Sequence, residues 1–216
     1  MSSNNPGRGN PGQGNLFIIA APSGAGKTSL VNELLKRDSR LVLSISHTTR
    51  AARPGEIDGQ HYHFVSETDY QQMVKNGDFM EHAQVFDHFY GSSRNSVTLQ
   101  LEAGLDVILE IDWQGARQVR SVFPHSCLIF IIPPSLETLR ERLTGRGQDS
   151  ASVIQRRMRD AQAEISHWAE FDHLVVNDDF DTALEELLTI INDHRTRQPH
   201  QVNKHNQLLA QRLGNS

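Results

Sequence analysis

The sequence predicts an α/β protein built on a doubly wound parallel sheet. Apolar runs with little polar alternation recur along the chain, which is typical of strands buried on both faces of a parallel sheet. Helical patterns separate most of these runs. A loop of small residues ending in Gly-Lys-Thr joins the first run to the first helix. The runs are Leu16 to Ala20, Leu41 to Ile45, Leu105 to Ile111, Cys127 to Ile132 and Leu174 to Val176.

The helices between these runs are predicted from apolar spacing and from residues typical of helix ends. Leu136, Leu139 and Leu143 share one face of a helix that begins at Ser135, after two prolines. Gly104 closes another helix. The predicted helices span Lys27 to Arg37, Ser93 to Ala103, Gln114 to Val122 and Ser135 to Leu143.

Composition narrows the class of protein. The chain has 216 residues, of which 37% are hydrophobic, enough for one domain with insertions. Its net charge of −5 argues against a general nucleic-acid surface. No apolar run is long enough for a membrane span, and we expect a cytoplasmic protein with no membrane contact. The single cysteine, Cys127, excludes an internal disulfide and is expected to be buried.

Residues Ala20 to Ser29 form a predicted phosphate-binding loop between a strand and a helix. Small residues let backbone N–H groups surround a polyphosphate, and the helix N-terminus adds its positive dipole end. Lys27 would reach the outer phosphates, and the Thr28 hydroxyl would bind Mg²⁺. Ala21 departs from the general pattern, which has glycine there. The predicted triphosphate site comprises Ala21, Pro22, Ser23, Gly24, Ala25, Gly26, Lys27, Thr28 and Ser29.

Two regions break the alternation of strand and helix. Residues 46–90 combine an Arg/Pro/Gly loop with short aromatic segments, His61 to Val65 and Phe79 to Phe89, that are expected to be antiparallel strands around a short helix. Residues 137–159 carry six arginines around a Gly-Arg-Gly turn and few bulky apolar residues, the make-up of a mobile, cationic helical lid.

Residues 1–15 are expected to be a disordered tail, and 196–216 a polar C-terminal extension.

Arg50 and Arg53 suggest a second phosphate site. They lie three residues apart beside Pro54 and Gly55, directly after the second predicted strand. Guanidinium groups bind phosphate oxygens in pairs, and loops after strands line the ligand edge of a doubly wound sheet. Taken alone, two arginines in a loop are also consistent with a solvated surface.

Seven short motifs occur in the order found in guanylate kinases, and the chain resembles that family from Leu16 to Asn192. They are Ala21-Pro-Ser-Gly-Ala-Gly-Lys-Thr, Ser46-His-Thr-Thr-Arg-Ala-Ala-Arg-Pro-Gly-Glu, Asp58-Gly-Gln-His-Tyr, Phe89-Tyr-Gly-Ser, Leu109-Glu-Ile-Asp-Trp-Gln-Gly, Gly145-Arg-Gly and Val176-Asn-Asp-Asp. The resemblance implies transfer of a phosphoryl group from ATP to GMP, and to dGMP, with Mg²⁺. It also implies a domain over 16–195, with a core of 16–45, 91–136 and 160–195, a GMP-binding insertion over 46–90 and a lid over 137–159.

The resemblance also assigns the acceptor site. The GMP phosphate would be held by Arg50, Arg53, Tyr62 and Tyr90, and the base would be read by Ser46, Glu81, Ser92 and Asp112. Guanine offers two adjacent donors that the carboxylate of Glu81 can accept, and adenine offers no such pair. A buried acceptor facing the wrong base would be left unpaired. From the residues alone, Glu81 could instead be a solvated acid, and the two tyrosines could be packing residues.

The donor side follows in the same way. The family implies that Arg142, Arg146 and Arg157 bind phosphate and that Asn177 contacts adenine, although a turn-forming asparagine is the alternative. Asp112, together with Glu110 on the same strand face, would hold Mg²⁺ through water or meet the base, and the sequence does not divide these duties.

The acceptor phosphate is largely ionised at neutral pH, since its second pKa is about 6, so the attack needs no general base. Catalysis would rest on positioning and electrostatics from Lys27, Arg142, Arg146 and Arg157. Two other functions remain as alternatives. One is a catalytically inactive interaction module of the same fold, and the other is a related sugar-phosphate kinase. The oligomeric state is not readable.

Overall fold

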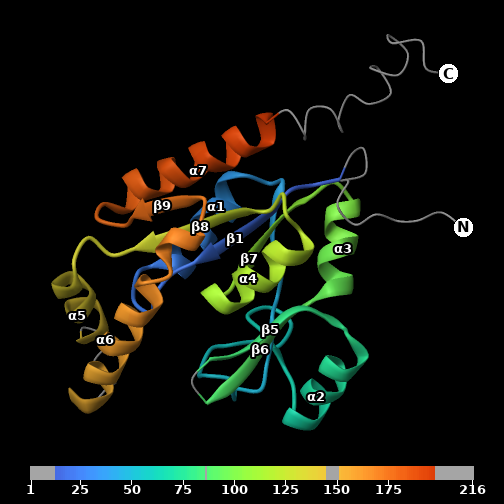
Figure 1. Ribbon diagram of the computed structural model, residues 1–216, viewed down its shortest axis with the longest axis horizontal. Coiled ribbons are helices and arrows are strands. Elements are labelled where there is room, and N and C mark those ends of the chain that lie inside the picture. The colour runs from blue at the N-terminus through green and yellow to red at the C-terminus, as the bar shows by residue number, and fades with distance from the viewer. Residues whose placement is uncertain (1–12, 86, 145–150, 198–216) are drawn as a thin grey trace, which may run out of the picture.

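A five-stranded parallel sheet forms the centre of the protein (Figure 1). The structure is a computed structural model that describes residues 13–85, 87–144 and 151–197. The strand order is β2-β7-β1-β8-β9, and every pairing is parallel, which confirms the predicted sheet. The strands are β1 (Leu16–Ala20), β2 (Leu41–Leu43), β7 (Asp106–Glu110), β8 (Cys127–Ile132) and β9 (His173–Val176).

Helices cover both faces of this sheet. On one face α1 (Lys27–Arg37) and α7 (Phe180–Thr196) bury apolar side chains against β1 and β8. On the other face α3 (Arg94–Glu102) and α4 (Trp113–Val122) pack on β1 and β7. The strands alternate between these two layers, so both faces are apolar, as expected for runs with little alternation. None of the described helices is long and apolar enough to cross a membrane.

A second, four-stranded sheet lies beside the first, with the strand order β4-β3-β6-β5. Strands β5 and β6 form an antiparallel hairpin from a stretch predicted as one segment, Phe79 to Phe89. The expectation of an antiparallel strand at His61 to Val65 is wrong, because the long connection after β3 returns the chain so that β4 runs parallel to β3. The elements are β3 (His47–Thr48), β4 (His63–Phe64), α2 (Glu67–Asn76), β5 (Phe79–Val85) and β6 (His88–Ser93).

Helix α4 attaches the second sheet to the first. The Gln118 side chain donates to the carbonyl of His82 at 2.8 Å and accepts from its amide at 3.1 Å. These two bonds satisfy backbone groups on the outer edge of β5. Because α4 also packs on the main sheet, it holds the two sheets together in one relative position.

Two further helices, α5 (Leu136–Thr144) and α6 (Ala151–Ile165), pack on each other and project from the main sheet (Figure 1). Their shared apolar cluster contains Leu139, Leu143, Met158 and Ala161. A short 3-10 helix, Trp168–Glu170, returns the chain to β9. Residues 1–12 of the predicted tail over 1–15, the turn containing Arg146 and the part of the predicted extension beyond residue 197 lie outside the described residues. The expectation of disorder is wrong for the end of the tail, because the Gly14 amide donates to the carbonyl of Leu101 at 2.8 Å and Asn15 bonds to Asp106.

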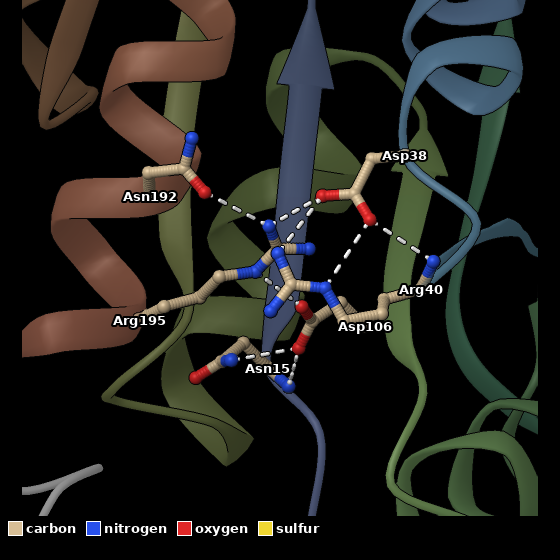
Figure 2. A network of polar contacts seen from close by, with 6 residues as sticks. All are labelled: Asn15, Asp38, Arg40, Asp106, Asn192 and Arg195. Atoms are coloured by element: carbon tan, nitrogen blue, oxygen red, sulfur yellow. Dashed lines mark hydrogen bonds and ion pairs between the residues drawn. The ribbon is translucent and has the colours of Figure 1, made fainter.

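A buried ion network ties three elements together at the amino edge of the sheet, away from the phosphate-binding loop. Figure 2 shows Arg195, from the last turn of α7, between two carboxylates. Its Nε donates to Asp106 at 2.6 Å and its Nη1 to Asp38 at 2.5 Å. Asp106 also accepts from the amide and side chain of Asn15, each at 2.7 Å. The guanidinium therefore joins the end of α1, the start of β7 and the C-terminal helix.

The pKa of Asp38 reflects this network. Burial raises it, but hydrogen bonds from Arg40 and Arg195 outweigh burial and lower the pKa to about 2. A carboxyl group with a depressed pKa stabilises the fold above its unfolded value of 3.8, and this contribution is lost as the pH falls from about 4 to 2.

We expect Arg195→Met to lower the free energy of unfolding by about 3 kcal/mol at pH 7, because it leaves two buried carboxylates without their shared cation. Arg197→Met is the matched control, since the Arg197 side chain is 45% exposed and forms an ion pair with the exposed Asp193 at 3.4 Å. The control should change stability by less than about 0.5 kcal/mol. Chemical denaturation at several pH values measures both variants. A difference between wild type and Arg195→Met that does not narrow as the pH falls toward 2 would contradict the role of Asp38.

Candidate functional site

The phosphate-binding loop follows β1 at the carboxyl edge of the main sheet. Gly24 and Gly26 adopt φ angles of 92° and 93°, a left-handed conformation that other residues rarely adopt. Gly26 precedes the first turn of α1 and has no side chain to cap it. The first backbone N–H groups of α1 are therefore left for an external anion.

Three contacts hold the loop against neighbouring strand ends. The buried side chain of Asn177 donates to the carbonyl of Ala25 at 2.7 Å. The Lys27 ammonium donates to the carbonyl of Ile111 at 3.4 Å. The Thr28 hydroxyl donates to Glu110 at 2.5 Å. The loop is thus connected to the chain after β7 on one side and after β9 on the other.

A cavity of about 300 Å³ lies in front of this loop. Its lining includes residues from the main sheet, the second sheet and α6. Fourteen of these positions are named in the sequence analysis: Ala21, Pro22, Ser23, Gly24, Gly26, Lys27, Thr28, Ser29, Ser46, Tyr62, Glu81, Tyr90, Glu110 and Asp112. The remaining lining residues are Ala83, Val85, Ile111 and Glu164.

Glu81 is the most deeply buried acid of the second sheet within this cavity. It lies on β5, is 3% exposed and accepts a hydrogen bond of 2.6 Å from the Ser92 hydroxyl on β6. Burial raises its pKa to about 7, although the bond from Ser92 lowers it. Gly115 of α4 makes room for it, since a Cβ there would lie 2.5 Å from Glu81 Oε2. The carboxylate is therefore held in place on two sides.

Tyr62 and Tyr90 form the other wall of this half of the cavity. Their rings meet edge to face, with centroids 6.0 Å apart. The Arg50 guanidinium lies over the Tyr62 ring at 5.3 Å, and Glu56 accepts from it at 2.8 Å. Glu56 also accepts from the backbone amide of Arg53 at 2.7 Å. Neither arginine lines the cavity itself, and Arg50 adjoins it through Tyr62.

The acid that ends β7, Glu110, and the acid that follows the strand, Asp112, differ in their surroundings. Asp112 caps α4 by accepting from the Gly115 amide at 2.9 Å, and its second oxygen accepts from Gln114 at 3.0 Å. Glu110 instead contacts the hydroxyl of Thr28. Hydroxyl and carboxylate oxygens are the ligands that Mg²⁺ prefers. Thr28 and Glu110 therefore fit a site for this ion better than Thr28 and Asp112.

The lid arginines do not line the cavity in the described part of the chain. Arg142 of α5 donates through Nη2 to the carbonyl of Asn177 at 3.0 Å, and its Nη1 is buried with no hydrogen-bond partner among the described residues. Arg157 lies on α6. The lid touches the loop through packing, because a Cβ on Gly24 would lie 2.9 Å from Leu139.

Sequence reasoning assigned no part in the site to Gly115 or Glu164. Gly115 ends the motif that begins at Leu109, but the close approach of Glu81 that requires a glycine there depends on the packing of α4 against β5. Glu164 lines the cavity from α6, but the sequence analysis assigned a role only to the arginines of this region. Both positions depend on contacts between segments far apart in the sequence.

The fold and the site define a class of protein. A doubly wound parallel sheet, a glycine-rich loop before α1 and a lysine and threonine at its end are the parts of a P-loop nucleotide-binding protein. The second sheet and the projecting helix pair border the same loop and cavity, as in a kinase that must hold two substrates together.

Comparison with known proteins gives the family. The family described as guanylate kinase matches residues 13–194. The chain is 55% identical over 200 residues to a guanylate kinase of Chromohalobacter salexigens, covering 93% of each chain. It is 51% identical to that of Escherichia coli K12, covering 93% of this chain and 98% of the relative. A crystal structure of guanylate kinase from Anaplasma phagocytophilum superposes with a TM-score of 0.78 at 32% identity, covering 95% and 98%. The chain belongs to the guanylate kinase family of enzymes.

Gly26→Ala is expected to weaken ATP binding by about 100-fold, because small displacements of a positioned site are costly. The new Cβ would lie 2.4 Å from Asn177 Nδ2, so the loop must shift or lose its bond to Asn177. Gly77→Ala is the control, since Gly77 has a φ of 74° but nothing within 4 Å. Calorimetric titration with ATP and thermal unfolding separate the two effects. Both variants should lose stability, and an equal loss of ATP affinity in both would contradict the prediction.

Proposed function

We propose that this protein is an ATP:GMP phosphotransferase, which transfers the γ-phosphoryl group of ATP to GMP, and to dGMP, in the cytoplasm. One observation carries the proposal: a single cavity joins the phosphate-binding loop to a buried carboxylate, Glu81, on a separate sheet. The phosphate-binding loop accounts for the half of the cavity that would hold ATP. The Glu81 carboxylate, which has few hydrogen-bond donors from the protein and lies in a pocket lined by tyrosines, accounts for the second half, which would hold GMP.

Guanine fits the second half chemically. Its N1–H and exocyclic amine are adjacent donors, and the Ser92 hydroxyl donates to one oxygen of Glu81, Oε1. Ser46 also lines this part of the cavity. We propose that Tyr62, Tyr90, Arg50 and Arg53 hold the phosphate, with the Arg50 guanidinium turning toward it from its present contact with Glu56.

The donor half is proposed to bind ATP through the loop over residues 21–29, with Lys27 at the outer phosphates. Mg²⁺, held by Thr28 and through water by Glu110 or Asp112, would neutralise charge on the phosphates when bound. Asn177 supports the loop through Ala25, and its contact with adenine stays a prediction. The unpartnered Nη1 of Arg142 leaves a donor for a phosphate oxygen, and Arg146 and Arg157 are proposed to join it when the lid closes.

The reaction requires no general base from the protein, because the acceptor phosphate is already largely ionised at neutral pH. The work of the chain is to bring two anions together and to stabilise the charge on the transferring group. Lys27 and the lid arginines supply positive charge, while the closed lid would exclude water as a competing acceptor.

A substrate panel tests the proposal. With ATP as donor and GMP, dGMP, AMP, UMP or ribose bisphosphate as acceptor, a coupled assay of ADP release measures kcat/KM for each. We expect guanine nucleotides to exceed the other acceptors by about 10³ or more, because a site that hydrogen-bonds its substrate rejects analogues lacking those groups. Preference for the sugar phosphate would favour the related kinase, and no ADP release with any acceptor would favour an interaction module.

Glu81→Gln should lower kcat/KM for GMP by about 10- to 100-fold, because the amide presents a donor to a base edge that also donates. The pKa of Glu81 is raised to about 7, so kcat/KM for GMP should increase as the pH rises through about 7 and the carboxyl ionises. Glu67→Gln, at an exposed position on α2, is the control. Steady-state kinetics from pH 5.5 to 8.5 measures all three proteins. Persistence of the step near pH 7 in Glu81→Gln would rule out Glu81 as its source.

A further inference from the structure

Glu164 places a further carboxyl group in the cavity, beside the phosphate-binding loop. It lies near the C-terminal end of α6 and lines the cavity together with Ser23 and Lys27 of the loop. The proposed triphosphate site needs positive charge at this end of the cavity. An acid at this position therefore requires an explanation of its own.

The contacts of Glu164 resemble those expected of a phosphate. Its Oε2 is buried and has no hydrogen-bond partner among the described residues. Burial raises the pKa of the Glu164 carboxyl to about 7, and the charges of Asp112 and Asp160 act in the same direction. The positive charge of Lys27 and a backbone hydrogen bond from Ser23 lower this pKa. The groups that favour the charged carboxylate therefore belong to the phosphate-binding loop.

We propose that Glu164 is an internal anion that occupies the phosphate-binding loop in the nucleotide-free protein and is displaced by the outer phosphates of ATP. This inference rests on the proposed ATP site and extends it to the lid. A carboxylate and a phosphate cannot use the Ser23 amide and Lys27 at once without strong repulsion. Binding of the triphosphate therefore moves Glu164, and α6 moves with it. Glu164 acts as a positioning residue that couples the lid to occupancy of the loop.

The two tryptophans of the chain lie beside the C-terminal end of α6, so a movement of this helix would change their surroundings. Helix α6 ends at Ile165, and Trp168 follows it in the 3-10 helix. The Trp113 ring, at the start of α4, stacks on His167 with centroids 3.6 Å apart and planes at 12°. Intrinsic fluorescence therefore reports on the junction between α6 and the core.

The test compares binding to wild type, Glu164→Gln, Glu164→Asp and the control Glu141→Gln. Glu141 is an exposed acid on α5, so its variant removes the same charge from the lid but not from the cavity. Calorimetry with the non-hydrolysable β,γ-imido-ATP and with GMP requires no turnover. A failure of GMP phosphorylation would be seen only in the kinetic assay, so it is distinguishable from a failure of this proposal.

We expect Glu164→Gln to bind β,γ-imido-ATP about tenfold more tightly than wild type, since the ligand no longer displaces a charge. GMP affinity should stay within about threefold in every variant. Glu164→Asp and Glu141→Gln should remain near wild type. In wild type, β,γ-imido-ATP should change the tryptophan emission, and in Glu164→Gln most of that change should be present before the ligand is added.

Two results would overturn the proposal. Unchanged or weaker binding of β,γ-imido-ATP by a folded Glu164→Gln would mean that the carboxylate does not compete with phosphate. Equal tightening in Glu164→Asp would mean that side-chain length, and not charge, controls binding. A merely structural contact would not tighten binding when it is removed.

Discussion

Parallel pairing of β1 with β7 on one side and β8 on the other places the phosphate-binding loop at the middle of the sheet's carboxyl edge. The loop leaves β1 there, and residues at the ends of β7 and β9 hold it. Glu110 at the end of β7 meets Thr28, and Asn177 after β9 meets Ala25. A change in this pairing would remove the contacts, and the two left-handed glycines would have no fixed orientation toward the cavity. The chemistry of the loop thus depends on the order of strands.

Helix α4 transmits that geometry to the second half of the site. Its first residues follow β7 directly, and Asp112 caps it. Gly115, which has no side chain, leaves room for Glu81 to lie close to the helix. The Gln118 side chain hydrogen-bonds to the backbone of β5. Residues 112–118 therefore contact both Glu81 and the edge of the second sheet. Glycine within a helix costs about 1 kcal/mol relative to alanine, and here it permits the carboxylate to lie against the helix.

Much of the fold could be predicted from the sequence because its signals are local. The runs at β1 and β8 match their predicted bounds, and Gly-Lys-Thr at a strand-to-helix junction indicates the loop without any tertiary information. The direction of β4 could not be predicted, since it depends on how residues 49–62 return. The contact of Thr28 with Glu110, and not with Asp112, required the register of β1 against β7. Glu164 enters the cavity only through the packing of α6, so nothing near it in the sequence indicated its position.

The proposed function requires that one cavity hold both nucleotides, with the loop at one end and Glu81 at the other. The most direct measurement is calorimetric titration with a bisubstrate ligand, in which adenosine and guanosine are joined by a polyphosphate chain. Linked ligands bind more tightly than their parts when both sites can be occupied together. We expect one ligand to bind per protein, with an affinity about 100-fold or more above that of either nucleotide. The bound ligand should exclude both GMP and ATP. Binding no tighter than ATP alone, with GMP still bound beside it, would contradict the claim.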